Sequence, residues 1–243
     1  MAVRAVLFDL YGTLIDIETD ERDWYTYLAL AKYLGYRGIS LSADEVRWFY
    51  FEKIRQMIEG SHERYPEIDV RRIWRELLGE HENPRLYRLN LDQCTFLEDI
   101  VALHRSLTLR RLRLFDATLD TVQSLKQTYL LGVVSDCQRE YAVPEMRMLG
   151  IDGLFDALIV SAEYGFRKPD RRLFNGCLSK LNVSSREAVF VGNNPYRDIG
   201  GAKSVGMRNI LVLGRRKREE VREAEPDFIV DDIGKVPEIV QRL

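Results

Sequence analysis

The chain has 243 residues, of which 46% are hydrophobic and 10% aromatic, a composition typical of a globular protein with a full core. Its 36 Lys and Arg nearly balance its 38 Asp and Glu, so the net charge of −2 provides no general attraction to nucleic acid or to anionic membranes. The three cysteines form no CxxC pair and the three histidines are scattered, which argues against a disulfide scaffold and a Cys/His zinc site. No apolar run approaches the ~20 residues of a membrane span, and we expect a soluble, cytoplasmic protein.

The first predicted element is a short buried strand over residues 4–8, which polar and turn residues end. Residues 20–108 then show only the helical spacing of apolar side chains. Helices are expected at 21–36, 43–60, 70–81 and 91–106. Ser42 and Glu45 form a capping-box pattern at the start of the second helix. We therefore predict an all-helical domain over residues 16–112.

From residue 114 onward, short strands rich in Val, Ile and Leu alternate with helical stretches. Strands are expected at 130–134, 157–160, 188–191, 209–213 and 227–230. Helices are expected at 117–127, 139–149, 170–181 and 197–206. This alternation predicts βαβ units and hence an α/β domain with a doubly wound parallel sheet, formed by residues 1–15 and 113–243.

Polar residues stand just after four of the predicted strands, at the edge where such sheets bind ligands. They are Asp9 after the first strand, Ser135 and Asp136 after the second, Lys168 after the third, and Asn193, Asn194 and Asp198 after the fourth. Each alone has an ordinary structural explanation as a turn residue, a helix cap or a solvated lysine. Their convergence on one edge of one sheet predicts a functional site.

In this order, the four motifs resemble those of the haloacid dehalogenase superfamily of hydrolases, over residues 4–15 and roughly 113–232. The resemblance implies a Rossmann-like catalytic core with a helical cap domain inserted between the first and second motifs. It also implies that Asp9 is the nucleophile, Ser135 a ligand of the substrate's anionic group, Lys168 the charge neutraliser and Asp198 the acid of the fourth motif.

The chemistry of these side chains agrees with such a role. A carboxylate can attack phosphorus or an sp³ carbon and form a covalent intermediate that water then cleaves. Lys168 would keep Asp9 ionised and offset the charge of an incoming anion. Gly12 and Thr13 would present backbone N–H groups and a hydroxyl to substrate oxygens. The expected substrate-binding residues are Gly12, Thr13, Ser135, Asp136 and Asn194, and the expected catalytic residues are Asp9, Tyr11 and Lys168.

Tyr11 departs from the phosphatase pattern, in which a second Asp two residues after the nucleophile protonates the leaving group. A tyrosine with a pKa of ~10 is a poor donor, and the Asp-x-Tyr-Gly-Thr form resembles the dehalogenase branch, whose halide leaves without a proton. The fourth motif favours a phosphatase, because Gly192-Asn193 followed by Asp198 resembles the Gly-Asp-x₄-Asp pattern of that branch. We predict a phosphatase acting on a small phosphate monoester. The alternatives are a metal-independent 2-haloacid dehalogenase and a non-catalytic protein that binds a phosphorylated ligand.

The phosphatase resemblance also implies Mg²⁺, which proteins usually hold with one or two carboxylates together with water and substrate phosphate. The expected ligands are Asp9, Asp198, the Tyr11 carbonyl and Asn193. Because Asn193 supplies an oxygen without a charge, we expect weaker binding than at a site with two Asp in the fourth motif. The expected partner is a small anionic substrate, with neither nucleic acid nor membrane, and the expected assembly is a monomer or a homodimer.

Overall fold

The computed structural model describes residues 2–81, 95–214, 221 and 223–243. Contacts divide the chain into two compact units, which we name the core unit (Met1–Ile17 with Leu112–Leu243) and the helical unit (Glu18–Arg111). The boundaries predicted from the sequence lie after residue 15 and before residue 113.

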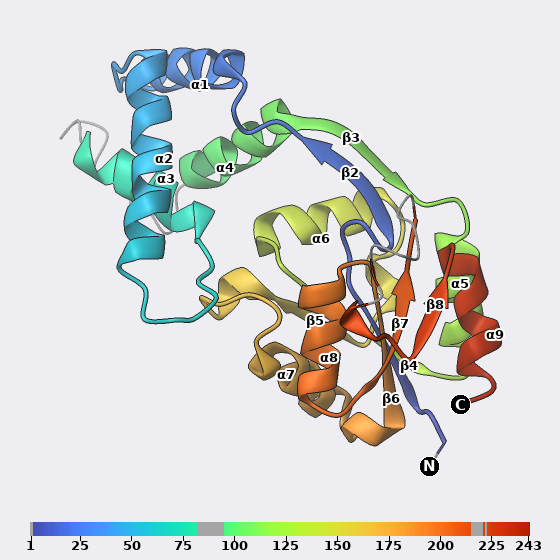
Figure 1. Ribbon diagram of the computed structural model, residues 1–243. Coiled ribbons are helices and arrows are strands. Elements are labelled where there is room, and N and C mark those ends of the chain that lie inside the picture. The colour runs from blue at the N-terminus through green and yellow to red at the C-terminus, as the bar shows by residue number, and fades with distance from the viewer. Residues whose placement is uncertain (1, 82–94, 215–220, 222) are drawn as a thin grey trace. The chain divides into compact units, whose positions relative to one another are not determined.

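The core unit contains a six-stranded sheet with the strand order β5-β4-β1-β6-β7-β8, in which every neighbouring pair is parallel (Figure 1). The strands are β1 (Ala5–Phe8), β4 (Leu130–Ser135), β5 (Ala157–Val160), β6 (Ala188–Gly192), β7 (Arg208–Val212) and β8 (Phe228–Val230). All six lie where strands were predicted, and the α/β fold class is confirmed. The chain builds outward from β1 in one direction and then in the other, so the ends of β1, β4 and β6 define the switch point of the sheet.

Helices cover both faces of this sheet. They are α5 (Thr118–Lys126), α6 (Arg139–Met148), α7 (Arg171–Leu181), α8 (Gly200–Ser204) and α9 (Val236–Val240). Alternate residues of a strand point to opposite faces: Val6 and Phe8 pack in a cluster with residues of α5, α6 and α9, whereas Ala5 and Leu7 pack with residues of α7 and α8. Short 3₁₀ turns occur at Asp152–Leu154, Ser161–Glu163, Ser185–Glu187 and Ile233–Lys235. The sheet is therefore buried on both sides, and its site lies at its carboxyl edge.

The helical unit contains the helices α1 (Trp24–Tyr36), α2 (Ala43–Glu59), α3 (Val70–Glu80) and α4 (Thr95–Thr108). The predicted capping box is confirmed, because the Glu45 N–H donates to Ser42 Oγ (3.2 Å) and the Ser42 N–H donates to Glu45 Oε2 (2.7 Å). The predicted start of the fourth helix, at residues 91–94, lies outside the described residues. Across the parts of the chain that the structure describes, no helix combines the length and the apolar character needed to cross a membrane.

A two-stranded sheet of β2 (Ile15–Thr19) and β3 (Leu109–Leu114) carries the chain between the units, and the sequence analysis missed it. The expectation that residues 16–112 are entirely helical is therefore wrong at both ends. Ion pairs connect the two strands: Arg113 Nε lies 3.0 Å from Asp16 Oδ2, and Arg111 Nη1 lies 2.6 Å from Glu18 Oε2. Cross-strand charge pairs can stabilise short strands that have no apolar run. The strands of the core unit were predicted from apolar runs, so β2 and β3 gave no such signal.

Candidate active site

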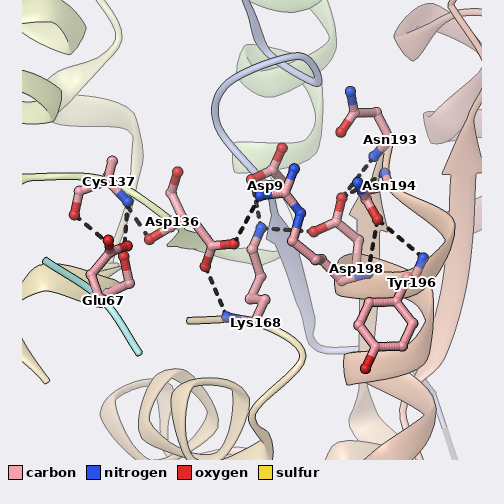
Figure 2. A network of polar contacts seen from close by, with 12 residues as sticks. Asp9, Glu67, Asp136, Cys137, Lys168, Asn193, Asn194, Tyr196 and Asp198 are labelled. Atoms are coloured by element: carbon pink, nitrogen blue, oxygen red, sulfur yellow. Dashed lines mark hydrogen bonds and ion pairs between the residues drawn. The ribbon is translucent and has the colours of Figure 1, made fainter. Parts of the chain in front are cut away.

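Asp9 directly follows the central strand β1, where its N–H donates to the Val191 carbonyl of β6 over 2.9 Å. The side chain is buried, with 5% of its residue surface exposed. Thr13 Oγ1 donates to Asp9 Oδ2 (2.9 Å), and Lys168 Nζ donates to Asp9 Oδ1 (2.6 Å). Both carboxylate oxygens are thus oriented by protein donors, as Figure 2 shows for the lysine side.

Gly12 allows the loop after β1 to turn back toward the fourth motif. Its φ of +86° lies in the left-handed region, and a Cβ at this position would lie only 2.4 Å from Asn193 Nδ2. Its N–H donates to the Ile15 carbonyl (2.8 Å), so this amide is satisfied within the loop. The Thr13 hydroxyl likewise donates its proton to Asp9. The substrate-binding role expected of Gly12 and Thr13 stays a prediction.

Lys168 joins the first and fourth motifs through its ammonium group. Its Nζ lies 2.6 Å from Asp9 Oδ1 and 2.7 Å from Asp198 Oδ1, and all three side chains are buried (Figure 2). Burial lowers the pKa of Lys168, but the carboxylates of Asp198, Asp9 and Asp136 outweigh it, and the pKa lies above its usual value. The lysine therefore stays protonated and holds the two acids together.

The pKa of Asp9 is raised to about 6, chiefly by burial and also by the charge of Asp198, against the lowering effect of Lys168. Its carboxylate is consequently ionised at neutral pH and poorly hydrated. A buried carboxylate that is ionised and aligned by two donors is suited to act as a nucleophile.

The fourth motif fixes Asp198 through backbone groups. Asp198 Oδ2 accepts the N–H groups of Asn193 (3.0 Å) and Asn194 (2.8 Å), and a Cβ on Gly192 would lie 2.5 Å from Asp198 Cβ. The predicted helix over 197–206 is instead a π-helical turn at Pro195–Ile199 followed by α8. This wider turn places Asp198 beneath the loop that follows β6, where its carboxylate reaches Lys168.

Asp136 and Asn194 shape the loops of the site. Asp136 Oδ1 accepts the backbone N–H of Lys168 (2.8 Å), and its Oδ2 lies 3.4 Å from Arg197 Nη1. Asn194 Oδ1 accepts the N–H groups of Tyr196 (3.1 Å) and Arg197 (2.9 Å), as an N-cap does. These side-chain oxygens bind other groups of the protein, and the substrate-binding role expected of both residues stays a prediction. Arg197, which links the second and fourth motifs, was not singled out from the sequence.

Ser135 ends β4 and is 1% exposed, and its Oγ has no hydrogen-bond partner among the described residues. Leaving a buried hydroxyl unpaired costs roughly 1–3 kcal/mol, so an unpaired hydroxyl at a strand end is a natural ligand for an anion. Cys137, two residues further on, is a poor nucleophile, since burial raises the pKa of its thiol to about 12.

Tyr11 is held by a residue that the sequence analysis missed. Its phenol donates a hydrogen bond to Glu145 Oε2 of α6, and its ring packs against the same hydrophobic cluster as Phe8. Glu145 is 2% exposed. No sequence signal distinguishes this acid from the solvent-exposed glutamates common on amphipathic helices.

The site brings two carboxylates together. The Oδ1 atoms of Asp9 and Asp198 lie 2.6 and 2.7 Å from Lys168 Nζ. Oxygen ligands are those that Mg²⁺ prefers. Within the described ranges, no three His, Cys, Asp or Glu side chains gather into a metal-binding group, so water and substrate oxygens would have to complete the coordination.

With this geometry in place, comparison with known proteins identifies the family. A family model described as haloacid dehalogenase-like hydrolase matches residues 6–212, and the chain belongs to this family. It is 28% identical to a glyceraldehyde 3-phosphate phosphatase of Methanothermobacter thermautotrophicus, over 98% of this chain and 100% of the relative. It is 25% identical to a putative pyrophosphatase PpaX of Caldanaerobacter subterraneus, over 99% and 96% of the two chains.

Solved structures share the fold across both branches of the family. The 2-haloacid dehalogenase of Pseudomonas syringae superposes with a TM-score of 0.68 at 22% identity, covering 99% of each chain. A HAD phosphatase of Thermococcus onnurineus superposes with a TM-score of 0.58 at 22% identity, covering 98% of each chain. Because both branches share this architecture, the choice between their reactions depends on the residues of the site.

Proposed function

We propose that the protein is a phosphatase that releases phosphate from a small phosphorylated molecule, with phosphate monoesters as the expected class. The observation that carries the proposal is the buried triad of Asp9, Lys168 and Asp198, with Lys168 Nζ 2.6 and 2.7 Å from the two carboxylates. Full-length relatives named as phosphatases support the choice of phosphorus over carbon as the reacting centre.

In the proposed reaction, Asp9 attacks phosphorus and forms an aspartyl phosphate while the leaving group departs. Water then hydrolyses this intermediate and restores the carboxylate. Lys168 offsets the negative charge that accumulates around Asp9, and the unpaired Ser135 hydroxyl binds an oxygen of the phosphoryl group. When bound, Mg²⁺ would be held by Asp9, Asp198, the Tyr11 carbonyl and Asn193, and would neutralise phosphate charge.

A second candidate is a metal-independent 2-haloacid dehalogenase, which Tyr11 favours because halide leaves without a proton. In that reaction Asp9 would attack carbon, and Lys168 would offset the charge of the substrate carboxylate. A third candidate, a non-catalytic binder of a phosphorylated ligand, is consistent with the replacement of acids at Tyr11 and Asn193.

One assay separates the three candidates: p-nitrophenyl phosphate and 2-chloropropionate, each with and without Mg²⁺. We expect phosphate release that depends on Mg²⁺ and no release of chloride. Chloride release without metal, together with no turnover across a panel of phosphates, would establish the dehalogenase. Binding of a phosphate ligand without any turnover would establish the third candidate.

We also propose that the helical unit, Glu18–Arg111, acts as the cap domain of the enzyme and selects its substrate. The protein is proposed to act in the cytoplasm as a monomer or a homodimer. Light scattering of the purified full chain distinguishes the two assemblies, and chimeras that exchange residues 18–111 with those of a relative test the role in selectivity.

A further inference from the structure

The hydrogen bond between Tyr11 and Glu145 bears on which leaving groups the site can expel. Tyr11 lies two residues after Asp9, and the proton of its hydroxyl group is the only acidic proton of the side chain. That proton is donated to Glu145 Oε2 on α6. A donor that is already engaged with a carboxylate is not directed at a leaving group beside Asp9.

Packing fixes the ring in this orientation. The Tyr11 ring lies against the hydrophobic cluster that covers the α5–α6–α9 face of the sheet, which includes Phe8 and Met146. Glu145 is 2% exposed, in the same turn of α6 as Met146. Turning the phenol away would leave a buried carboxylate without this donor, which is costly.

Two other proton donors beside Asp9, on Thr13 and Lys168, are engaged as well. The Thr13 hydroxyl donates to Asp9 Oδ2, and the Lys168 ammonium lies between the two carboxylates. The Cys137 thiol is buried, and burial raises its pKa to about 12. Ser135 retains an unpaired hydroxyl, but an alcohol is a weaker acid than a phenol and does not replace a general acid.

We propose that the substrates of this site are phosphoanhydrides, in which phosphate is joined to the oxygen of a carboxylic or a phosphoric acid. The proposal rests on the proposed phosphatase function, and it replaces phosphate monoesters with phosphoanhydrides as the expected substrate class. Tyr11 and Glu145 together are the determinant, because they remove from the site the proton that an alkoxide would need.

The proposed step balances without a general acid. Asp9 Oδ attacks phosphorus, the bond between phosphorus and the acid oxygen breaks, and the leaving group keeps the electron pair as a carboxylate or a phosphate anion. Water then attacks the aspartyl phosphate, Asp9 leaves as a carboxylate, and both water protons depart on dihydrogen phosphate. No proton passes through Tyr11 in either half of the reaction.

The energetic gap between leaving groups is large. Carboxylic acids have pKa values of ~4 and phenols of ~10, whereas alcohols lie near the value of water, ~16. General acid catalysis typically contributes about 10²–10⁴-fold, mostly for the poorest leaving groups. A site without an acid therefore hydrolyses anhydrides and loses about this factor on alkyl esters.

The test compares kcat/KM of the wild-type protein, with Mg²⁺, for acetyl phosphate, pyrophosphate, p-nitrophenyl phosphate and ethyl phosphate. We expect kcat/KM for acetyl phosphate or pyrophosphate to exceed that for ethyl phosphate by at least about 10²-fold. The better of the two substrates shows whether the leaving group is a carboxylic or a phosphoric acid. Tyr11→Asp, which introduces an acid, should raise ethyl phosphate turnover at least about 10-fold and change acetyl phosphate less.

Tyr11→Asn is the matched control, because it removes the phenol and its hydrogen bond equally but has no proton to give. Ethyl phosphate should not gain in this variant. Wild-type turnover of ethyl phosphate within about 10-fold of acetyl phosphate would overturn the inference, as would an equal gain in the Asp and Asn variants, and neither outcome would affect the proposed function. Failure to hydrolyse any of the four phosphates would overturn the proposed function and this inference with it.

Discussion

The core unit and the helical unit differ in the surroundings of two sets of buried polar side chains. In the core unit, the carboxylates of Asp9 and Asp198 and the ammonium of Lys168 are buried together, and each has partners within 3 Å. In the helical unit, the buried His104 ring and Trp74 Nε1 have no hydrogen-bond partner among the described residues. Buried charge that is fully paired indicates chemistry, whereas an unpaired polar atom in an aromatic cluster indicates a group retained for its shape.

The surroundings of His104 support this distinction. Its ring centroid lies 4.6 Å from that of Tyr50 and 5.2 Å from that of Trp74, both in edge-on contact. The Tyr27 ring centroid lies 6.3 Å away. Burial lowers the pKa of His104 to about 3, so the ring is neutral under ordinary conditions. It therefore fills space as an aromatic side chain does.

The largest effect should come from the nucleophile. Asp9→Asn removes the attacking oxygen while changing almost no volume, and we expect phosphate turnover to fall by at least about 10³-fold. The thermal stability of this variant should not fall together with its turnover. Because the pKa of Asp9 is raised from 3.8 to about 6, its ionised form disfavours the fold above pH 6, and a neutral side chain removes that effect. The Tm at pH 8 should not decrease.

Asp156→Asn serves as the control for this variant. Asp156 directly precedes β5, where its carboxylate accepts the Leu131 N–H (2.8 Å) and pairs with Lys126 (2.6 Å). It contacts none of the motif residues through these bonds, so the Tm should decrease and turnover should persist. If Asp9→Asn retained activity, the assignment of the core unit as catalytic would be refuted.

The second effect is on stability. Lys168→Met leaves two buried carboxylates without their shared cation, and breaking a buried pair typically costs about 3–5 kcal/mol. Lys168 lowers the pKa of Asp9, so without the ammonium Asp9 binds a proton more readily in the folded state, and the deficit should be largest at pH 8 and shrink toward pH 5. Thermal unfolding of both proteins at these two pH values measures it. A deficit that does not vary with pH would show that the lost contacts are packing rather than charge.

The pH dependence of turnover gives the third test. Asp9 attacks only as a carboxylate, so with a pKa of about 6 the kcat/KM for p-nitrophenyl phosphate should decrease about tenfold per unit below pH 6. A bound cation favours the ionised form, and saturating Mg²⁺ should move this limb to lower pH. A profile that stays flat down to pH 4.5 would contradict the raised pKa of Asp9.

The same contrast separates what the sequence could predict from what it could not. The six strands of the core unit are continuous apolar runs because both faces of their sheet are buried, and such runs are readable. The strands β2 and β3 were missed because they carry charged residues, and their pairing depends on ion pairs such as Asp16–Arg113 between positions far apart in the sequence.

For the site, the order of Asp9, Lys168 and Asp198 along the chain was sufficient to predict that they meet, since parallel strands end at one edge. Their catalytic roles remain predictions. Asp136 accepts a hydrogen bond from the Lys168 N–H, and Tyr11 donates one to Glu145. Both contacts depend on the tertiary placement of loops and of α6. No spacing rule encodes those contacts, so the sequence alone assigned Asp136 to substrate binding, and Tyr11 to catalysis and to the metal.

The smallest effect should come from His104, and it tests the other half of the comparison. Replacing His104 with Phe keeps an aromatic ring among Tyr27, Tyr50 and Trp74 while removing two buried nitrogens without partners. Two buried nitrogens without partners destabilise the fold by roughly 1–3 kcal/mol. Their removal should therefore stabilise the protein, and strain from the larger phenyl ring will cancel part of this gain. We expect an increase in Tm of a few degrees at pH 7.5 with turnover unchanged, since His104 lies outside the core unit.

The sign of the pH dependence makes the His104 test specific. His104 has a pKa of about 3 when folded and an ordinary value of 6.5, so its neutral form contributes stability that is lost progressively as pH falls below 6.5. His104→Phe does not titrate, and its advantage should grow by about 1.4 kcal/mol per pH unit between pH 6 and pH 5. Denaturant titrations of both proteins at pH 7.5, 6 and 5 would show this divergence. An advantage that stays constant with pH would mean that His104 becomes hydrated or paired in solution, and its contrast with the paired charges of Asp9, Lys168 and Asp198 would then be lost.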